Sequence, residues 1–196
     1  MMNYRQIKLG LKNKCVCIAG CGGLGSNIAV ALARVGVGKL IIADFDKIEK
    51  DNLNRQYFFL DQIGSYKATA LKENIYRIDQ SIEVEAHIVK LAPTNITELF
   101  ECGDIIVEAF DKAEMKEMIV ETVLSEFPAK PIVCGAGLAG WGGNELINVE
   151  RYDNLYIVGD HISETSEDDP PIAPRVGIVA NMMANVVLEL LLGKDK

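Results

Sequence analysis

The chain has 196 residues, a length typical of one domain with a single hydrophobic core. With 49% hydrophobic and 24% charged residues, its composition excludes the intrinsically disordered class. Its 20 basic and 28 acidic residues give a net charge of −8, which argues against a broad surface for nucleic acid or for an anionic membrane. The amino-terminal segment lacks the apolar core of a signal peptide, and no run of about eighteen apolar residues occurs. We therefore expect one cytoplasmic domain over residues 1–196.

Apolar runs of strand length alternate with helical patterns through the first two thirds of the chain. Short β-branched runs predict buried strands, and apolar residues at helical spacing predict the helices between them. The expected elements, in chain order, are a strand at Lys14–Ala19, a helix at Leu24–Val35 that ends at glycine, a strand at Lys39–Ala43, a helix at Lys67–Ile78, strands at Ile82–Val89 and Asp104–Ala109, a helix at Glu114–Phe127 and a strand at Pro131–Cys134.

The last third of the chain has a different sequence pattern. After a glycine-rich stretch, Asn144–Val149 and Leu155–Val158 have the pattern of antiparallel edge strands. Residues 159–174 read as a polar loop that we expect to be mobile and to contact a partner. Its acidic side chains are Asp160, Glu164, Glu167, Asp168 and Asp169. The chain then forms a strongly apolar helix at Val176–Leu192, which ends at Gly193.

The alternation of strands and helices predicts the fold class. It is typical of an α/β protein with a doubly wound, Rossmann-like sheet that is mainly parallel and has right-handed crossovers. The expected architecture adds antiparallel edge strands and a C-terminal helix. Ligands in such a sheet bind beyond the carboxyl ends of its strands, so we look for functional residues there.

A glycine motif stands between the first expected strand and helix. The segment GCGGLGS contains G-x-G-x-x-G, in which Gly20 permits the tight turn, Gly22 and Gly23 let backbone approach a phosphate, and Gly25 allows close helix packing. Asp44 ends the next strand, about twenty residues on, where a carboxylate accepts hydrogen bonds from ribose hydroxyls. This spacing indicates a nucleotide site, for which the motif alone suggests NAD.

Two basic residues beyond the second strand change that expectation. Arg55 and Lys67 can reach the same crevice, where they would neutralise a triphosphate better than the diphosphate of a dinucleotide. The alternative is that Arg55 pairs with a nearby acid and that Lys67 is an ordinary solvated helix lysine. Asp111 follows the strand at Asp104–Ala109 and has two possible roles as well. It can hold Mg²⁺ against the phosphates, or it can be the N-cap of the following helix.

Five segments together resemble a known family. GCGGLGS, DFDKIEKDNLNRQ, GSYKA, the late aspartate Asp111 and APRVGIVANMMANVVLELLLG look like the ThiF/MoeB/HesA adenylyltransferases, which are relatives of ubiquitin-activating enzymes. The similarity runs from about Arg5 to Gly193. It implies an enzyme that uses Mg²⁺ and ATP to adenylate the C-terminal glycine carboxylate of a small ubiquitin-like sulfur-carrier protein ending in Gly-Gly, with release of pyrophosphate. The shortness of the chain favours a thiamine-type carrier, and a sulfur-donor protein is a possible further partner.

The resemblance also implies roles for single residues. Asp44 would hold the ribose, Asn52, Arg55 and Lys67 would contact the phosphates, and Asp111 would bind the metal. Arg5 matches by position a family arginine that reaches into the ATP site of a neighbouring subunit, which implies a homodimer. The alternative for Arg5 is a solvated arginine near the amino terminus.

Three departures from the family pattern bear on these roles. The five cysteines include no Cys-x-x-Cys pair, so we expect neither the structural zinc of longer members nor a disulfide framework. Residues 136–196 contain no cysteine for a covalent step, and Cys134 reads as a buried small hydrophobe rather than a reactive thiol. Lys112 stands where the family places an asparagine, which affects the expected metal geometry.

Other functions remain open on the sequence. One alternative is adenylation of a different carboxylate, such as that of a modified tRNA base or of a peptide. A second is an NAD-dependent oxidoreductase that uses the same glycine turn. A third is a nucleotide-binding scaffold without catalysis.

Overall fold

A computed structural model describes residues 2–193 of the chain. It contains one seven-stranded sheet with the strand order β3-β2-β1-β4-β5-β7-β6. The strands are β1 (Cys15–Ala19), β2 (Lys39–Ala43), β3 (Glu83–His87), β4 (Ile105–Glu108), β5 (Ile132–Gly135), β6 (Asn148–Tyr152) and β7 (Leu155–Gly159). Every neighbouring pair is parallel except β6 and β7, which form an antiparallel hairpin at the edge.

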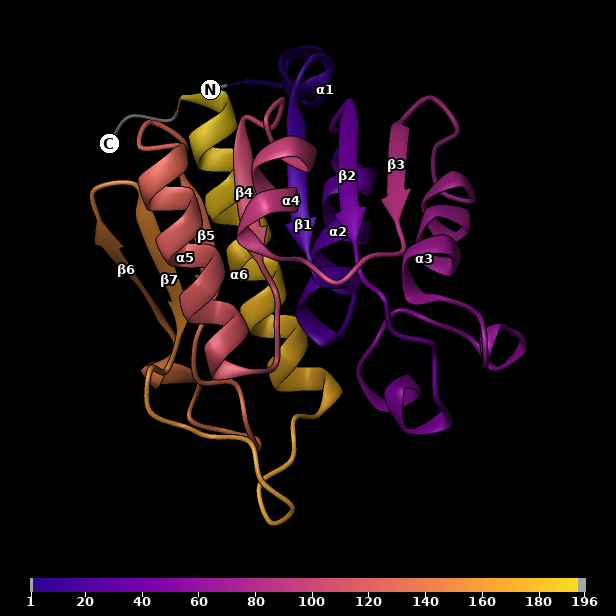
Figure 1. Cartoon of the computed structure of the whole chain (residues 1–196), viewed down its shortest axis with the longest axis vertical. Coiled ribbons are helices and arrows are strands. Elements are labelled where there is room, and N and C mark those ends of the chain that lie inside the picture. Colours follow the sequence, from indigo (N-terminus) through magenta and orange to yellow (C-terminus); the bar gives the residue numbers. More distant parts are fainter. Residues whose placement is uncertain (1, 194–196) are drawn as a thin grey trace.

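Helices cover both faces of this sheet (Figure 1). They are α1 (Tyr4–Leu11), α2 (Gly23–Val35), α3 (Lys67–Tyr76), α4 (Pro93–Leu99), α5 (Ala113–Glu126) and α6 (Ala173–Leu192). Side chains of α2, α3 and α6 share one buried apolar cluster with one sheet face, and those of α4 and α5 share a second cluster with the other face. The expected doubly wound α/β architecture is therefore confirmed.

The topology defines where a ligand would bind. The chain winds from β1 outward to β2 and β3, then returns to β4 on the other side of β1. The strand order therefore reverses between β1 and β4, and in such sheets ligands bind beyond the carboxyl ends of the strands at this point. The glycine turn follows β1, and the segment with Asp111 follows β4.

Several sequence expectations need correction. Residues 144–146 form a short 3-10 helix, so the edge strand starts at Asn148 and not at Asn144. β7 is parallel to β5, because the chain first crosses to the outer edge and the β6–β7 hairpin then brings it back. α1 and α4 were not expected, since each is too short to show a clear helical period.

The start of α6 also differs from expectation. It begins at Ala173 and takes Pro174 into its first turn, where the missing backbone N–H of proline costs nothing. By length and composition α6 is apolar enough to cross a membrane, but half of its most apolar stretch is buried inside the protein. It packs along α2 and the sheet as a core helix.

Candidate nucleotide site

The glycine turn is shaped by close backbone contacts. Gly20 has a φ of +97°, and a Cβ atom there would lie 2.8 Å from the carbonyl oxygen of Ala109. A Cβ atom at Gly25 would lie only 1.9 Å from the carbonyl oxygen of Gly20. No side chain caps the N-terminus of α2, whose N-cap is Gly22. The turn therefore brings free helix amides and the positive end of the helix dipole to the carboxyl edge of the sheet.

We expect Gly25→Ala to destabilise the protein by at least about 2 kcal/mol, because its methyl group would overlap the turn backbone. The matched control is Gly177→Ala in α6, where an added Cβ meets no atom within 4 Å. That control should stabilise the helix by about 0.5–1 kcal/mol. Urea unfolding of both variants measures the difference. Equal stability of the two variants would contradict the steric role of Gly25.

Asp44 ties the end of β2 to the glycine turn. Its Oδ2 accepts a hydrogen bond from the N–H of Cys21 (2.7 Å), and its Oδ1 accepts one from the N–H of Asp46 (2.7 Å). Burial raises the pKa of Asp44, while these two N–H groups and the ammonium of Lys67 oppose the shift. The carboxylate thus lies beside the turn, at the position that the sequence predicts for a ribose-binding acid.

The segment with Asn52 and Arg55 is fixed on the start of α2 by two side chains. The hydroxyl of Ser26 donates to the carbonyl of Gly22 (2.6 Å) and accepts from the N–H of Tyr57 (3.0 Å). The amide of Asn27 donates to the carbonyls of Gly23 (2.7 Å) and Arg55 (2.9 Å). Sequence analysis missed both roles, since nothing in the sequence shows that two segments about thirty residues apart pack together.

Neither Arg55 nor Lys67 matches the structural alternative that the sequence left open for it. Lys67 is buried, with 9% of its side chain exposed, and its Nζ donates to Asp46 Oδ2 at 3.0 Å. The interpretation of Lys67 as a solvated helix lysine is therefore wrong. Arg55 donates to Asn54 Oδ1 and to the carbonyl of Asp51, and it pairs with no acidic side chain among residues 2–193.

Arg55 lies close to the turn, and Asn52 lies in the short helix just before Arg55. The side-chain stem of Arg55 runs over Gly23, where a Cβ atom would be 3.6 Å from its Cγ. Asn52 accepts a hydrogen bond from the N–H of Glu49 through Oδ1, which closes the first turn of the 3-10 helix η1 (Lys50–Asn54). This geometry brings the side chain of Arg55 to the uncapped start of α2.

Asp111 is exposed and does not cap α5. The N-cap of that helix is Lys112, which makes no side-chain cap bond, so the N-cap alternative for Asp111 is wrong. The Asp111 carboxylate has no hydrogen-bond partner in the described part of the chain. The segment before it lies against the glycine turn, where the ring of Phe110 would be 3.5 Å from a Cβ at Gly20.

A buried ion pair holds the segment that carries Asp111. Glu108 ends β4 and is fully buried, and Lys116 donates to both of its carboxylate oxygens at 2.9 Å. The same ammonium donates to the carbonyl of Gly135, and the N–H of Phe110 donates to Glu108 (2.7 Å). Burial raises the pKa of Glu108, and Lys116 opposes this shift. The network links the carboxyl ends of β4 and β5 to the start of the Asp111 segment.

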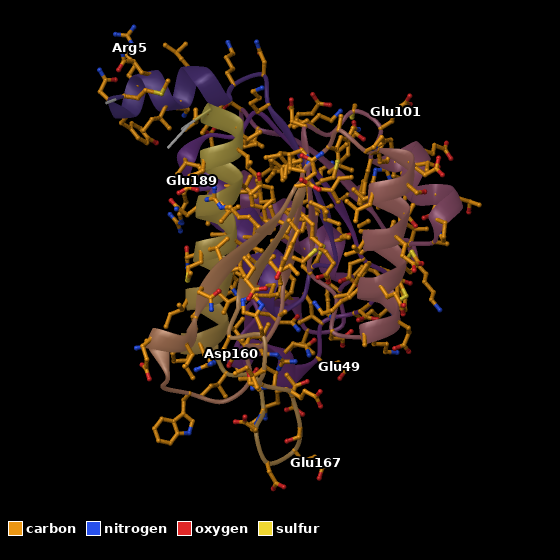
Figure 2. The ribbon with its side chains drawn as sticks, turned by 90° about the vertical axis from the view of Figure 1, so that its left-hand side faces the viewer. Arg5, Glu49, Glu101, Asp160, Glu167 and Glu189 are labelled. Atoms are coloured by element: carbon orange, nitrogen blue, oxygen red, sulfur yellow. The ribbon has the colours of Figure 1, made fainter. Side chains whose placement is uncertain are left out.

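Arg5 is not part of this group within one chain. It lies on α1 at one end of the molecule, whereas Glu49 and Asp160 lie near the other end (Figure 2). Its side chain is exposed, as the alternative of a solvated arginine requires. The structure therefore places Asp44, the stem of Arg55 and Lys67 near the glycine turn, with Asp111 one residue beyond Phe110, whose ring borders the turn, and it leaves Arg5 apart.

The acidic loop is anchored at its base. Asp160 follows β7 and is buried, and its Oδ2 accepts a hydrogen bond from Arg175 in the first turn of α6. Arg175 also donates to the carbonyl of Gly142 and so holds the glycine-rich segment against the same point. Asp160, which the sequence groups with the other acids of the loop, is thus buried and paired. Glu167 projects into solvent at the tip (Figure 2).

Comparison with known proteins confirms the resemblance. The model of the ThiF family matches residues 6–196 of the chain. The chain belongs to the ThiF family.

Curated relatives of this ThiF-family chain are longer proteins. It is 36% identical over 135 residues to the adenylyltransferase and sulfurtransferase MOCS3 of Caenorhabditis briggsae, covering 68% of this chain and 33% of that relative. It is 29% identical over 196 residues to the adenylyltransferase and sulfurtransferase UBA4 of Scheffersomyces stipitis, covering 96% of this chain and 43% of that relative. The chain therefore spans about a third to under a half of the length of these relatives.

A solved structure shares the fold. The tRNA N6-threonylcarbamoyladenosine dehydratase TcdA of E. coli, solved in complex with ATP, superposes with a TM-score of 0.86. The alignment covers 96% of the ThiF-family chain and 89% of the TcdA chain at 19% sequence identity. Likeness at this identity shows the common Rossmann-like architecture.

The cysteines of the ThiF-family chain lie mainly in the core. Burial raises the pKa of the Cys134 thiol well above its usual range, and nearby Glu108 adds to this effect. Cys134 is therefore a buried hydrophobe, as expected. Burial likewise raises the pKa of Cys21, which points into the core from the glycine turn.

The carboxylate available at the site suits a magnesium ion that is bound together with nucleotide phosphates. Among residues 2–193, no three His, Cys, Asp or Glu side chains gather in a group that could hold a metal ion. Magnesium in nucleotide enzymes needs only one or two carboxylates, because the phosphates and water supply its other ligands. The exposed carboxylate of Asp111, one residue beyond Phe110, fits that requirement.

Proposed function

We propose that this ThiF-family chain is an ATP-dependent adenylyltransferase that activates a carboxylate. The observation that carries the proposal is that Asp44 and the stem of Arg55 lie at the uncapped start of α2, with Lys67 close to Asp44. Asp111 follows β4, the end of which lies against the same turn. One carboxylate suits a ribose, two cations suit a phosphate chain, and the exposed carboxylate suits a metal held by phosphates. The same set exceeds what the diphosphate of NAD needs, which favours ATP over a dinucleotide.

The chemistry requires charge neutralisation more than a protein nucleophile. The carboxylate of the substrate attacks the α-phosphorus of ATP, a new C–O–P linkage forms, and the bond to the β-phosphate oxygen breaks to release pyrophosphate. Arg55 and Lys67 oppose the negative charge on the phosphates, and the helix amides add fixed dipoles. Because these groups are held by Ser26, Asn27 and Asp46 before the substrate binds, little reorganisation is needed.

We propose a small ubiquitin-like sulfur-carrier protein as the source of the carboxylate, at a C-terminal glycine and of the thiamine-biosynthesis type. Support comes from the curated relatives, which are named as both adenylyltransferases and sulfurtransferases. The second candidate is the carboxylate of a modified tRNA base, because the fold of TcdA, a tRNA-modifying enzyme by name, matches nearly the whole chain.

Exchange of radiolabelled pyrophosphate into ATP tests the proposal directly. Purified protein should catalyse exchange with Mg·ATP only when a cognate carrier is present. Mass spectrometry of the trapped product should show the carrier heavier by one adenylate. If instead NADH, and not Mg·ATP, raises the unfolding temperature, the oxidoreductase alternative is favoured and the proposal fails.

Replacement of Asp111 with asparagine should lower exchange about a hundredfold without changing stability. The reason is that the carboxylate is exposed and makes no hydrogen bond in the described chain, so its loss affects the metal alone. The matched control is Glu114→Gln, an exposed acid in the first turn of α5. The control should change exchange less than twofold, whereas equal effects of the two variants would show a general charge effect.

We further propose a cytoplasmic homodimer for this protein. Within one chain Arg5 lies at the end of the molecule away from the nucleotide site (Figure 2). It can therefore contribute to catalysis only in the site of a second copy. Its exposure on α1 leaves it accessible for such a contact.

A further inference from the structure

Three cysteines lie together at the amino ends of β1 and β4, the edge of the sheet opposite the glycine turn. Cys15 and Cys17 are buried on the same face of β1, in the apolar cluster that α4 and α5 cover. Cys102 is exposed in the short turn before β4, and all three thiols are free. Glu101, the neighbour of Cys102, lies at the end of the molecule away from Glu49 (Figure 2). The proposed nucleotide chemistry makes no use of these thiols.

The turn that carries Cys102 packs against β1. The N–H of Cys15 donates to Asp104 Oδ2, and the N–H of Asp104 donates to the carbonyl of Cys15, both at 2.8 Å. A Cβ atom at Gly103 would lie only 2.4 Å from Cys17 Sγ. Since Gly103 is the next residue after Cys102, the turn places Cys102 beside the face of β1 that carries both buried thiols.

Further contacts hold this turn in place. The N–H of Gly103 donates to the carbonyl of Phe100 (3.2 Å), and the Phe100 side chain is fully buried in the same apolar cluster. The Lys130 ammonium donates to the carbonyl of Phe100 (3.0 Å) and to that of Glu101. The fold itself therefore fixes the position of Cys102 next to the buried thiols.

The surroundings give the thiols different properties. The neighbouring Cys17 thiol lowers the pKa of Cys15, the Cys102 thiol and the Lys39 ammonium add to this effect, and burial opposes it. The pKa of Cys17 is raised by Cys15 and by burial, and that of Cys102 is raised by burial and by Cys15. Cys15 is thus the readier thiolate and Cys102 the accessible thiol, which are the two properties that formation of a disulfide needs.

We propose that Cys15 and Cys102 are a redox-active pair, which a low-molecular-weight disulfide converts to an intramolecular disulfide. The thiolate of exposed Cys102 attacks one sulfur of the reagent, so a mixed disulfide forms and one reagent thiolate leaves. The thiolate of Cys15 then attacks the Cys102 sulfur, the protein disulfide closes and the second reagent thiolate leaves. The two protein thiols give up two electrons to the reagent, and their protons end on the two released thiols.

Oxidation should affect stability and not the nucleotide site. The bond joins two segments that are far apart in the chain, so it restricts the unfolded state more than the folded one. The unfolding temperature should therefore rise by roughly 5–10 °C. Affinity for ATP should stay within twofold of that of the reduced protein, because the pair lies at the other edge of the sheet.

Thiol labelling and mass spectrometry test the proposal on the native protein. The protein is equilibrated with mixtures of reduced and oxidised glutathione, then unfolded and alkylated with N-ethylmaleimide. The oxidised form should carry two fewer labels than the five of the reduced protein. Peptide mapping should show Cys15 joined to Cys102, and dithiothreitol should restore all labels.

Two variants make the test specific. Cys102→Ser changes an exposed side chain, so it should fold like wild type and form no intramolecular disulfide. Cys134→Ala is the matched control, since it removes a buried thiol from β5, near the opposite edge of the sheet. That variant should keep the bond between Cys15 and Cys102.

Three results would overturn the proposal. The first is that native wild type keeps every thiol across the glutathione series. The second is that Cys102 ends in another bond, as a lasting mixed disulfide with glutathione, as a disulfide with Cys17 or as one with Cys102 of a second copy. The third is that Cys102→Ser loses two thiols as wild type does. None of these results depends on whether the protein adenylates a carboxylate.

Discussion

Replacement of Arg55 with alanine is expected to lower carrier-dependent pyrophosphate exchange about a thousandfold, with little change in stability. Arg55 lies over Gly23 and has no acidic partner among the described residues, so its guanidinium charge is available for the phosphates. Because its hydrogen bonds to Asn54 and the carbonyl of Asp51 are local, their loss should not unfold the protein.

Two variants make this prediction specific. Arg55→Lys keeps the charge but loses the forked donor geometry, so it should recover only part of the lost activity. Arg77→Ala removes an arginine that contacts the Phe59 ring at 5.7 Å, and it should leave exchange within twofold of wild type. Exchange by Arg55→Ala within tenfold of wild type would contradict the role of Arg55.

Arg175→Met is expected to lower the free energy of unfolding by about 3 kcal/mol or more, because it leaves the Asp160 carboxylate buried without its cation. The variant also releases the carbonyl of Gly142, so the glycine-rich segment loses its contact with α6. Urea unfolding measures the change. The double variant Asp160→Asn with Arg175→Met should recover much of the loss, since no unpaired charge then remains buried.

An exposed ion pair gives the control for this experiment. Arg151 and Glu189 are 2.9 Å apart with 45% and 28% of their side chains exposed, so Arg151→Met should cost less than about 1 kcal/mol. A cost for Arg175→Met no larger than this would show that the base of the acidic loop does not depend on the buried pair.

The pH dependence of stability provides an independent check on the same pair. Burial alone would raise the pKa of Asp160, but the N–H groups of Ser163 and Ile162, the Ser163 hydroxyl and Arg175 together lower it to about 2. Since the unfolded value is 3.8, this stabilisation is present above that pH and is lost as the pH falls toward 2. Asp160→Asn should therefore flatten the loss of stability over this acid range.

The sequence by itself determined the class of fold and the general place of the site. The elements expected at Lys14–Ala19, Leu24–Val35 and Lys39–Ala43 match β1, α2 and β2 to within one residue. Buried parallel strands and the helices that cover them must be apolar, so their residues stand out in the sequence. The glycine motif was equally informative, since a Cβ atom added at Gly25 would lie 1.9 Å from the Gly20 carbonyl oxygen, which no residue but glycine avoids without a shift of the backbone.

Only the tertiary structure decided which polar groups act together. Lys67 is buried against Asp46, and Asp160 is buried against Arg175, although both acids and both bases look like surface residues in the sequence. Gln56 is buried and its Oε1 has no hydrogen-bond partner among residues 2–193, which the sequence pattern could not show. The physical reason is that periodicity reports the apolar faces of local elements, whereas pairing of polar side chains depends on contacts between segments distant in the chain.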